Sequence, residues 1–149
     1  MSKFASTSAA GTKAFARRTI EKLLRAGHRP LVIALSGELG SGKTMFVQGL
    51  ARALGIRSKL QSPTFVLAKW YRFGPRRGGF RRFIHVDAYR LRGAGEARAM
   101  GLTHTLGDRD AIVVIEWAER IRKLIPQRAV QVRFRHGKKP NERLITINE

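Results

Sequence analysis

The stretch that most constrains how this chain folds runs from Gly37 to Thr44 and has the sequence GELGSGKT. It fits the pattern G-x-x-x-x-G-K-[ST], in which every fixed position has a physical task. The glycines let backbone N–H groups turn inward around phosphate oxygens. Lys43 reaches the β- and γ-phosphates of a nucleotide, and the hydroxyl of Thr44 suits Mg²⁺, which prefers hard oxygen ligands. The stretch therefore predicts a phosphate-binding P-loop at the start of a helix.

The segments on either side have the order that a P-loop requires. Residues 31–35 (LVIAL) form an unbroken apolar run, as expected of a central parallel strand covered on both faces. Apolar side chains then recur at helical spacing, and Gly55 follows where a C-cap glycine belongs. The order strand, loop, helix favours the P-loop over an ordinary glycine-rich turn.

All eight residues of the loop are expected to form the phosphate cradle: Gly37, Glu38, Leu39, Gly40, Ser41, Gly42, Lys43 and Thr44. Glu38 is interpreted as a variable position of the loop rather than a catalyst. Lys43 is expected to be solvated and to supply only phosphate contacts.

Composition narrows the class of protein. A chain of 149 residues is long enough for one domain with one core, so we expect a single domain over residues 1–149. No apolar run approaches the roughly 18 residues of a membrane span. The absence of cysteine excludes disulfides and cysteine-based zinc sites. The 4 histidines show no metal-ligand spacing, so each is interpreted as structural or solvated.

The amino-terminal segment and the net charge each leave an alternative open. Residues 1–20 contain no acid and four basic residues, which resembles a transit peptide in composition. We favour a short lead-in before a first helix, and hence a cytoplasmic protein. The net charge of +20 predicts attraction to polyanions, and a general bias of the source towards basic residues is the alternative.

The remaining elements alternate between strands and helices, which indicates an α/β fold. We expect a P-loop NTPase-like, mainly parallel sheet flanked by helices, with β-hairpins. Helices are predicted at residues 12–24, 96–100 and 118–125, and strands at 65–71, 83–86 and 111–115. Residues 73–82 are interpreted as a basic hairpin loop, and residues 130–134 and 144–147 as an exposed hairpin around a turn at 137–141.

Two acids stand where a nucleotide site would need them. The chain has only 10 acids, and Asp87 and Glu116 each end an apolar strand. Ligands of α/β sheets bind beyond the carboxyl ends of the strands, so both acids should lie beside the P-loop. Either could hold Mg²⁺, directly or through water, or orient the attacking water. The alternatives are a loop-capping role for Asp87 and an ion pair between Glu116 and Arg120.

Two further residues are candidates for the site. Trp117 directly follows the apolar strand, where it serves either as packing or as a neighbour of the nucleotide. Thr64 lies in a loop after the first strand–helix unit, where switch-like segments of P-loop enzymes occur. A simple turn at residues 62–64 is the alternative for Thr64.

Four motifs in this order carry a family resemblance: GELGSGKT at 37–44, SPTF at 62–65, HVDAYRL at 85–91 and IEW at 115–117. Together they resemble the TsaE family, the small bacterial ATPases of tRNA threonylcarbamoyladenosine (t6A) synthesis. The resemblance extends from the first helix to the final hairpin. The P-loop is common to many families, whereas the other three motifs together are specific.

The resemblance implies a function that spacing alone does not. Proteins of this family support TsaD and TsaB, and ATP hydrolysis, weak or partner-dependent, is thought to reset that complex. By similarity, Lys43 binds phosphate, Thr44 and Glu116 hold Mg²⁺, and Asp87 assists hydrolysis. Thr64 would belong to a switch-like catalytic loop, and Trp117 would lie near ATP. Contact with tRNA would be indirect or through the basic surface.

The chain departs from the family pattern at Met45, in its high positive charge, and in four arginines at 76, 77, 81 and 82. Other functions remain as alternatives. A small P-loop kinase acting on a metabolite is the main one, with residues 90–98 as a lid, although nothing marks an acceptor site. An RNA-binding protein with a vestigial P-loop would have lost Lys43 or Thr44. A GTPase is disfavoured because no N-K-x-D motif is present.

Overall fold

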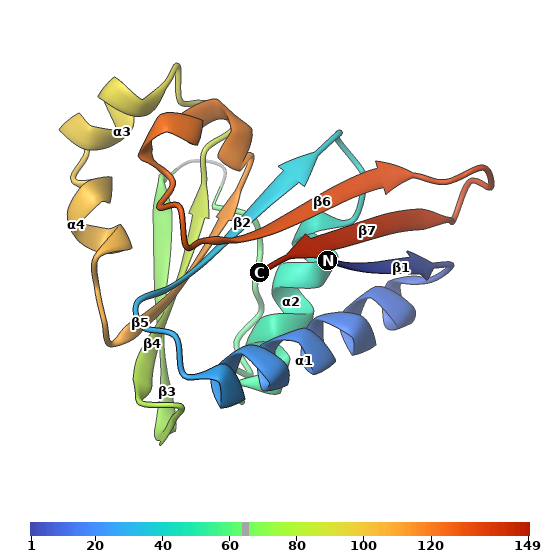
Figure 1. Cartoon of the computed structure of the whole chain (residues 1–149), viewed down its shortest axis with the longest axis horizontal. Coiled ribbons are helices and arrows are strands. Elements are labelled where there is room, and N and C mark those ends of the chain that lie inside the picture. Colours follow the sequence, from blue (N-terminus) through green and yellow to red (C-terminus); the bar gives the residue numbers. More distant parts are fainter. Residues whose placement is uncertain (64–65) are drawn as a thin grey trace.

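The computed structural model describes residues 1–63 and 66–149, with the backbone alone at residues 75 and 76. Its centre is a seven-stranded sheet in the order β1-β7-β6-β2-β5-β4-β3 (Figure 1). The strands are β1 (Ser2–Ser6), β2 (Leu31–Gly37), β3 (Ala68–Arg77), β4 (Phe80–Asp87), β5 (Ala111–Glu116), β6 (Val130–His136) and β7 (Arg143–Asn148). The helices are α1 (Ala9–Ala26), α2 (Lys43–Ala53), α3 (Ala94–Ala99), α4 (Leu102–Leu106) and the 3₁₀ helix η1 (Ala118–Leu124).

Four neighbouring strands of the sheet are parallel. β5 pairs with both β2 and β4, and β2 also pairs with β6. The antiparallel strands β3, β7 and β1 extend this parallel centre at its two sides. The predicted α/β fold with a mainly parallel sheet and β-hairpins is therefore confirmed.

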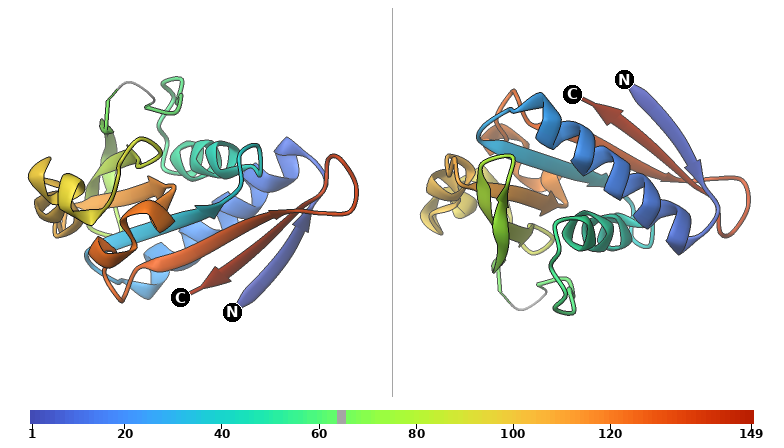
Figure 2. Two further views of the ribbon diagram at one scale, coloured as in Figure 1. Left: turned by 90° about the horizontal axis from the view of Figure 1, so that it is seen from above. Right: turned by 90° about the horizontal axis from the view of Figure 1, so that it is seen from below.

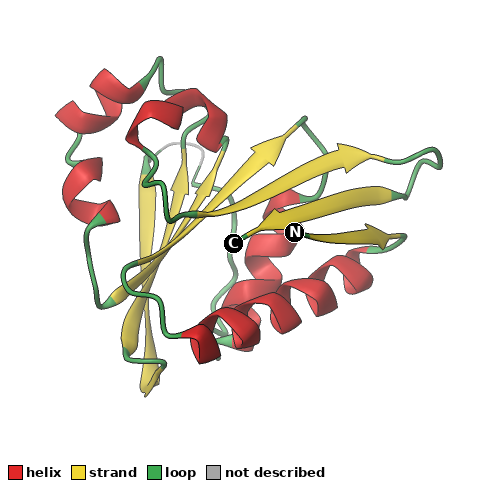
Figure 3. Ribbon diagram, viewed as in Figure 1, coloured by secondary structure: helices red, strands yellow, loops and turns green. Residues whose placement is uncertain are grey.

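Helices lie on both faces of the sheet (Figure 3). One hydrophobic cluster joins α1 and α2 to one face, and a second joins α3, α4 and η1 to the other. The apolar runs of β2 and β5 lie between these clusters, and Leu31 to Leu35 are at most 3% exposed. Because both faces of β2 and β5 are buried, the apolar residues in these strands do not alternate with polar ones.

Particular residues set the two ends of α1 and its close contact with α2. Ser8 caps α1 by accepting a hydrogen bond from the Gly11 N–H, and Gly27 ends it with a φ of 73°. A Cβ atom at Gly49 would lie 2.7 Å from Ala16 Cβ, so this glycine permits the contact between the helices. Helix α1 is longer at both ends than the predicted 12–24, and Gly55, with a φ of 86°, follows α2 as expected.

Several sequence predictions were wrong in detail. The expected lead-in contains strand β1, which pairs with β7 at one edge of the sheet. The expected loop at 73–82 is mostly strand, because β3 and β4 continue to a tight turn at Gly78 and Gly79. Gly74 and Pro75 fall at an irregularity of β3, which an edge strand tolerates. The helix α4 was not predicted, and the helix expected at 118–125 is a kinked 3₁₀ helix.

The carboxyl-terminal hairpin was predicted correctly, with β6 and β7 on either side of the turn. The structure adds its place in the sheet, because β6 pairs with β2 and β7 pairs with β1. Figure 2 shows α1 and α2 together on one side of these strands.

Candidate nucleotide site

The P-loop connects the end of β2 to the start of α2, and its glycines are required by its path. Gly37 has a φ of 138°, and an added Cβ would lie 2.4 Å from the carbonyl oxygen of Phe134 on β6. Gly40 and Gly42 also have positive φ values, 70° and 102°. These conformations favour glycine, and they turn the loop around the amino end of α2.

Lys43 lies inside the loop rather than in solvent, so the expectation of a solvated lysine was wrong. Its side chain is 4% exposed, and its ammonium donates to the carbonyl oxygens of Gly37, at 2.5 Å, and Glu38, at 2.8 Å. Nζ also lies 3.8 Å from the centroid of the Trp117 ring. The ammonium is therefore fixed by the loop that it would serve.

Burial lowers the pKa of Lys43 from its ordinary value, because desolvation disfavours the charged form. Four carboxylates oppose this change and raise the pKa, in the order Glu116, Glu119, Asp87 and Glu38. The loop thus holds the Lys43 ammonium near four carboxylates. The cation suits a negatively charged ligand, and the carboxylates suit a metal cation bound with it.

Glu116 and Thr44 are joined directly. Thr44 Oγ1 donates to Glu116 Oε2 at 3.0 Å, and Glu116 is 3% exposed at the end of β5. The alternative ion pair with Arg120 is not formed: the Arg120 guanidinium lies 5.0 Å from the centre of the Tyr89 ring. The structure therefore brings the P-loop hydroxyl of Thr44 and the strand-end carboxylate of Glu116 together in one place.

His85 holds Glu116 from the other side. Its Nε2 lies 2.8 Å from Glu116 Oε1, and His85 is fully buried. A carboxylate only accepts hydrogen bonds, so Nε2 carries the proton of this bond. Nδ1 is buried and has no hydrogen-bond partner in the part of the chain that the structure describes. His85 therefore orients Glu116 and fixes one of its oxygens.

Asp87 is both a loop cap and a neighbour of Glu116. Its Oδ1 accepts from the Tyr89 N–H at 2.9 Å, the local contact expected of a capping aspartate. Its Oδ2 accepts from the Ser62 hydroxyl at 2.6 Å, which ties the loop after α2 to the end of β4. In the register of β4 and β5, Asp87 lies opposite Glu116. The two acids expected beside the P-loop therefore meet there.

Trp117 has an unusual backbone. Its φ of 59° makes it the one residue other than glycine with a positive φ among those described. Such a conformation costs about 1–3 kcal/mol and persists where the surrounding structure imposes it. Here it turns the ring towards Lys43 and to 4.9 Å from the Tyr89 ring. Trp117 thus closes one side of the site.

The remaining atoms of the loop fit a nucleotide phosphate with Mg²⁺. Ser41 Oγ is buried and has no hydrogen-bond partner among the described residues. Within the same ranges, no cluster of three or more His, Cys, Asp or Glu could hold a metal alone. Mg²⁺ is commonly held by one or two carboxylates together with substrate phosphates, so the pair Thr44 and Glu116 suits it.

Sequence reasoning missed several neighbours of the site: Ser62, His85, Tyr89 and Glu119. Glu119 Oε1 accepts from the Gly37 N–H at 3.4 Å. His85 had been interpreted as merely structural or solvated. Its position two residues before Asp87 was the available signal, because alternate residues of a strand share one face. Thr64 lies outside the described residues.

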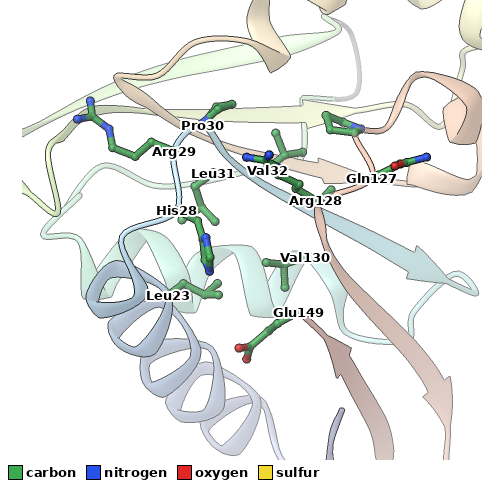
Figure 4. Close-up of a pocket in the computed structure, with 12 residues that line it drawn as sticks. Leu23, His28, Arg29, Pro30, Leu31, Val32, Gln127, Arg128, Val130 and Glu149 are labelled. Atoms are coloured by element: carbon green, nitrogen blue, oxygen red, sulfur yellow. The ribbon is translucent and has the colours of Figure 1, made fainter.

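A separate pocket of about 720 Å³ lies at the opposite end of β2 (Figure 4). Its lining includes His28, Arg29, Arg128 and Glu149 but no residue of the P-loop. Arg29 is held there by Asp110, at 2.8 Å, and by two backbone carbonyls. This pocket is therefore distinct from the candidate nucleotide site.

The parallel sheet, the loop at its centre and the acids at the strand ends define a protein of the P-loop NTPase-like α/β class. The sequence model of the family described as "Threonylcarbamoyl adenosine biosynthesis protein TsaE" matches residues 6–145. The chain belongs to the TsaE family, whose role is in t6A biosynthesis.

Individual relatives agree with this assignment. The TsaE protein of Streptomyces coelicolor is 44% identical over 103 residues, covering 68% of this chain and 64% of that protein. The TsaE protein of Mycobacterium tuberculosis H37Rv is 38% identical over 119 residues, covering 77% and 70%. The TsaE protein of Bacillus subtilis is 34% identical over 116 residues, covering 77% and 68%.

A solved structure agrees with the fold. The crystal structure of YdiB from B. subtilis superimposes with a TM-score of 0.73 at 29% identity, covering 98% of this chain and 83% of YdiB. Among the helices of the described residues, none has the length and apolar character needed to cross a membrane.

Proposed function

We propose that this chain binds ATP with Mg²⁺ at the P-loop and hydrolyses ATP, weakly or with its partners, in support of t6A modification of tRNA. The observation that carries the proposal is the hydrogen bond between Thr44 Oγ1 and Glu116 Oε2 beside the buried ammonium of Lys43. It joins a P-loop hydroxyl to a strand-end carboxylate, which is the oxygen pair that a Mg²⁺–nucleotide complex needs.

Each residue of the site then has a proposed task. The backbone N–H groups of the loop and Lys43 bind the phosphates, and Thr44 and Glu116 hold Mg²⁺, which neutralises charge on the phosphate oxygens. Asp87 orients the attacking water and accepts its proton. Thr64 is proposed to act from the switch-like loop, and Trp117 to lie beside the nucleotide.

The juxtaposition of Asp87 and Glu116 supports a cation at this place. Like charges directly opposite on neighbouring strands repel each other. Lys43 offsets part of this repulsion: burial lowers its pKa, and both acids oppose that change by favouring its charged form. A bound Mg²⁺ would offset more, so the protein is expected to gain stability when Mg²⁺ and nucleotide bind together.

The partners are proposed from the family. TsaD and TsaB would form the complex that ATP hydrolysis resets, and tRNA would be reached indirectly or through basic side chains. Of the four hairpin arginines, Arg82 donates two hydrogen bonds to Asp108, at 2.8 and 2.9 Å, and Arg77 donates to the Ala53 carbonyl at 3.2 Å. Arg81 is exposed, whereas the side chain of Arg76 lies outside the described part.

The alternative of a metabolite kinase would need an acceptor pocket beside the P-loop. A hollow beside Asp87 is lined by apolar side chains, among them Val66 and Leu67, and by the polar side chains of Asp87, Tyr89 and Arg90. A phosphate acceptor needs such polar groups to fix its orientation, so the hollow is compatible with either reaction. The match to a family of t6A biosynthesis is what favours support of tRNA modification over a metabolite kinase.

The test is ATP binding by Lys43→Ala. We expect the affinity for ATP with Mg²⁺, measured by calorimetry, to fall by about two orders of magnitude, because a buried charge pairing with phosphate is lost. Lys13→Ala removes an exposed lysine from α1 and should bind ATP normally. Native-like affinity in Lys43→Ala, with its fold intact by circular dichroism, would sink the proposal.

A further inference from the structure

One face of the strands β1, β7 and β6 is covered by no helix of the described residues. The side chains on their other face belong to the cluster that contains α1 and α2. The second cluster, formed with α3, α4 and η1, includes no residue of these three strands. Figure 2 shows this half of the sheet projecting beyond the second layer of helices. We call this uncovered surface the open face.

The open face is marked by six side chains whose register brings them together: Lys3, Arg133, Arg135, Leu144, Thr146 and Asn148. Thr146 pairs with Lys3 on one side and Arg133 on the other, so these three form a row across the strands. Leu144 pairs with Arg135 in the next row. A hollow of about 580 Å³ lies along these residues.

The open face carries cations without acids. Lys3, Arg133 and Arg135 are exposed, and none forms an ion pair with a residue that the structure describes. No Asp or Glu lies within β1 or β6 or among the residues lining the hollow. From strand geometry, Lys3 and Arg133 stand about 10 Å apart, and Arg133 and Arg135 about 7 Å apart. The sheet thus holds three positive groups at a fixed spacing.

We propose that the open face binds the phosphate backbone of RNA, and specifically of tRNA. Guanidinium groups bind phosphate through two parallel hydrogen bonds, and the hydroxyl of Thr146 and the amide of Asn148 suit the sugar 2′-OH. The one aromatic ring in the lining of the hollow is half-buried: Phe4 stacks on Phe15 and packs against the core, so no free ring is offered on which a base could stack. Recognition is therefore of the backbone and not of the sequence.

RNA fits this surface better than an acidic protein does. The spacing is set by a rigid sheet, which matches a repeating polyanion, and the +20 charge of the chain adds long-range attraction. The choice of tRNA among RNAs rests on the proposed function in t6A modification. The binding itself requires neither ATP nor the P-loop.

The test compares two variants that each remove three positive charges. The open-face variant combines Lys3→Gln, Arg133→Gln and Arg135→Gln and so removes the three positive charges of the open face. The helix variant combines Lys13→Gln, Arg25→Gln and Arg52→Gln and removes three exposed charges from α1 and α2. Binding of an unmodified tRNA transcript is measured over a salt series. We expect the open-face variant to bind about tenfold or more weakly, with a slope of log affinity against log salt flatter by about 2–3, because three phosphate contacts are lost. The helix variant should stay near native.

Three results would overturn the proposal. Equal losses in both variants would assign binding to net charge alone, and native-like binding by the open-face variant would place the RNA elsewhere. Loss of binding to polyglutamate with unchanged tRNA binding would assign the face to an acidic protein. Calorimetry of ATP on the same variants keeps this test separate from the nucleotide site, because ATP binding should be native in both.

Discussion

The two halves of the sheet use charge in opposite ways. The half formed by β2, β5 and β4 is covered on both faces, and at its carboxyl edge Glu116 and the P-loop residue Lys43 are at most 4% exposed. Each of them makes specific hydrogen bonds with neighbouring groups. The half formed by β6, β7 and β1 is covered on one face, and the other face carries exposed cations that form no ion pair with a described residue.

This difference predicts which single substitutions should have large effects on binding or stability. A buried charge that loses its partner suffers the full cost of desolvation, so changes in the first half should be large and specific. An exposed cation contributes one of several similar contacts, so changes in the second half should be small and additive. The following experiments test that contrast, from the largest expected effect to the smallest.

The acids of the nucleotide site should separate hydrolysis from binding. We expect Asp87→Ala to lower the ATPase rate, measured with TsaD, TsaB and tRNA present, by about 10²–10⁴-fold with little change in ATP affinity, because a general base is lost. Glu116→Ala should instead weaken ATP binding in Mg²⁺ but not in EDTA. Normal hydrolysis by both variants would show that the site is misassigned.

Removing His85 should affect both stability and metal dependence. In His85→Ala, Glu116 keeps Thr44 but loses its other buried partner, so the free energy of unfolding in urea should fall by about 1–3 kcal/mol. The Mg²⁺ concentration needed for half-maximal ATP binding should rise about 10–100-fold, as for other residues that orient a metal ligand.

Two controls make the effect of His85 specific. His104→Ala removes an exposed histidine from α4 and should change neither quantity. His85→Gln retains a donor that can reach Glu116, and it should restore part of the Mg²⁺ response. A loss of stability with an unchanged Mg²⁺ requirement would limit His85 to a packing role.

Trp117 should report the nucleotide while contributing modestly to affinity. We expect ATP or ADP with Mg²⁺ to change the fluorescence of the native protein, because the ring lies 3.8 Å from the Lys43 ammonium. Trp117→Phe should remove this signal and weaken binding only a few-fold, because phenylalanine retains a cation–π contact. Trp70 is 57% exposed on β3 and serves as the internal control. A full signal in Trp117→Phe would place the reporter elsewhere.

The site was predictable from sequence where the chemistry is local. The P-loop and the acids at the ends of β4 and β5 follow from short patterns, and strand ends of a parallel sheet meet at one edge. His85 was not predictable in this way, because its role depends on the register of two strands. The solvation of Lys43 was misjudged because the carbonyls of Gly37 and Glu38 fold back over it, which no spacing reveals.

The fold shows the same limit at its two edges. The apolar runs of β2 and β5 identified the centre of the sheet, because burial on both faces leaves a simple composition. Strand β1 and the extension of β3 were missed, since edge strands carry mixed residues and gain their structure from pairing with β7 and β4. Pairing with a neighbouring strand decided the outcome at these edges, and local propensity did not.

The smallest expected effect concerns the arginines of the β3–β4 hairpin. Replacing Arg76, Arg77, Arg81 and Arg82 by serine should weaken tRNA binding and flatten its salt dependence, while ATP binding remains. The structure sharpens this prediction, because Arg82 is already engaged by Asp108 whereas Arg81 is exposed. Phosphate contacts should therefore come from Arg81 more than from Arg82.

Single substitutions in this hairpin provide the matched pair. We expect Arg81→Ser to flatten the slope of log affinity against log salt by about 0.7–0.9, the effect of one phosphate contact, with unchanged stability. Arg82→Ser should leave the slope unchanged and lower the free energy of unfolding by up to about 1 kcal/mol, because a partly exposed ion pair is lost. Identical slopes for Arg81→Ser, the four-arginine variant and the native protein would assign these arginines to background composition. Any remaining salt dependence would then belong to the open face.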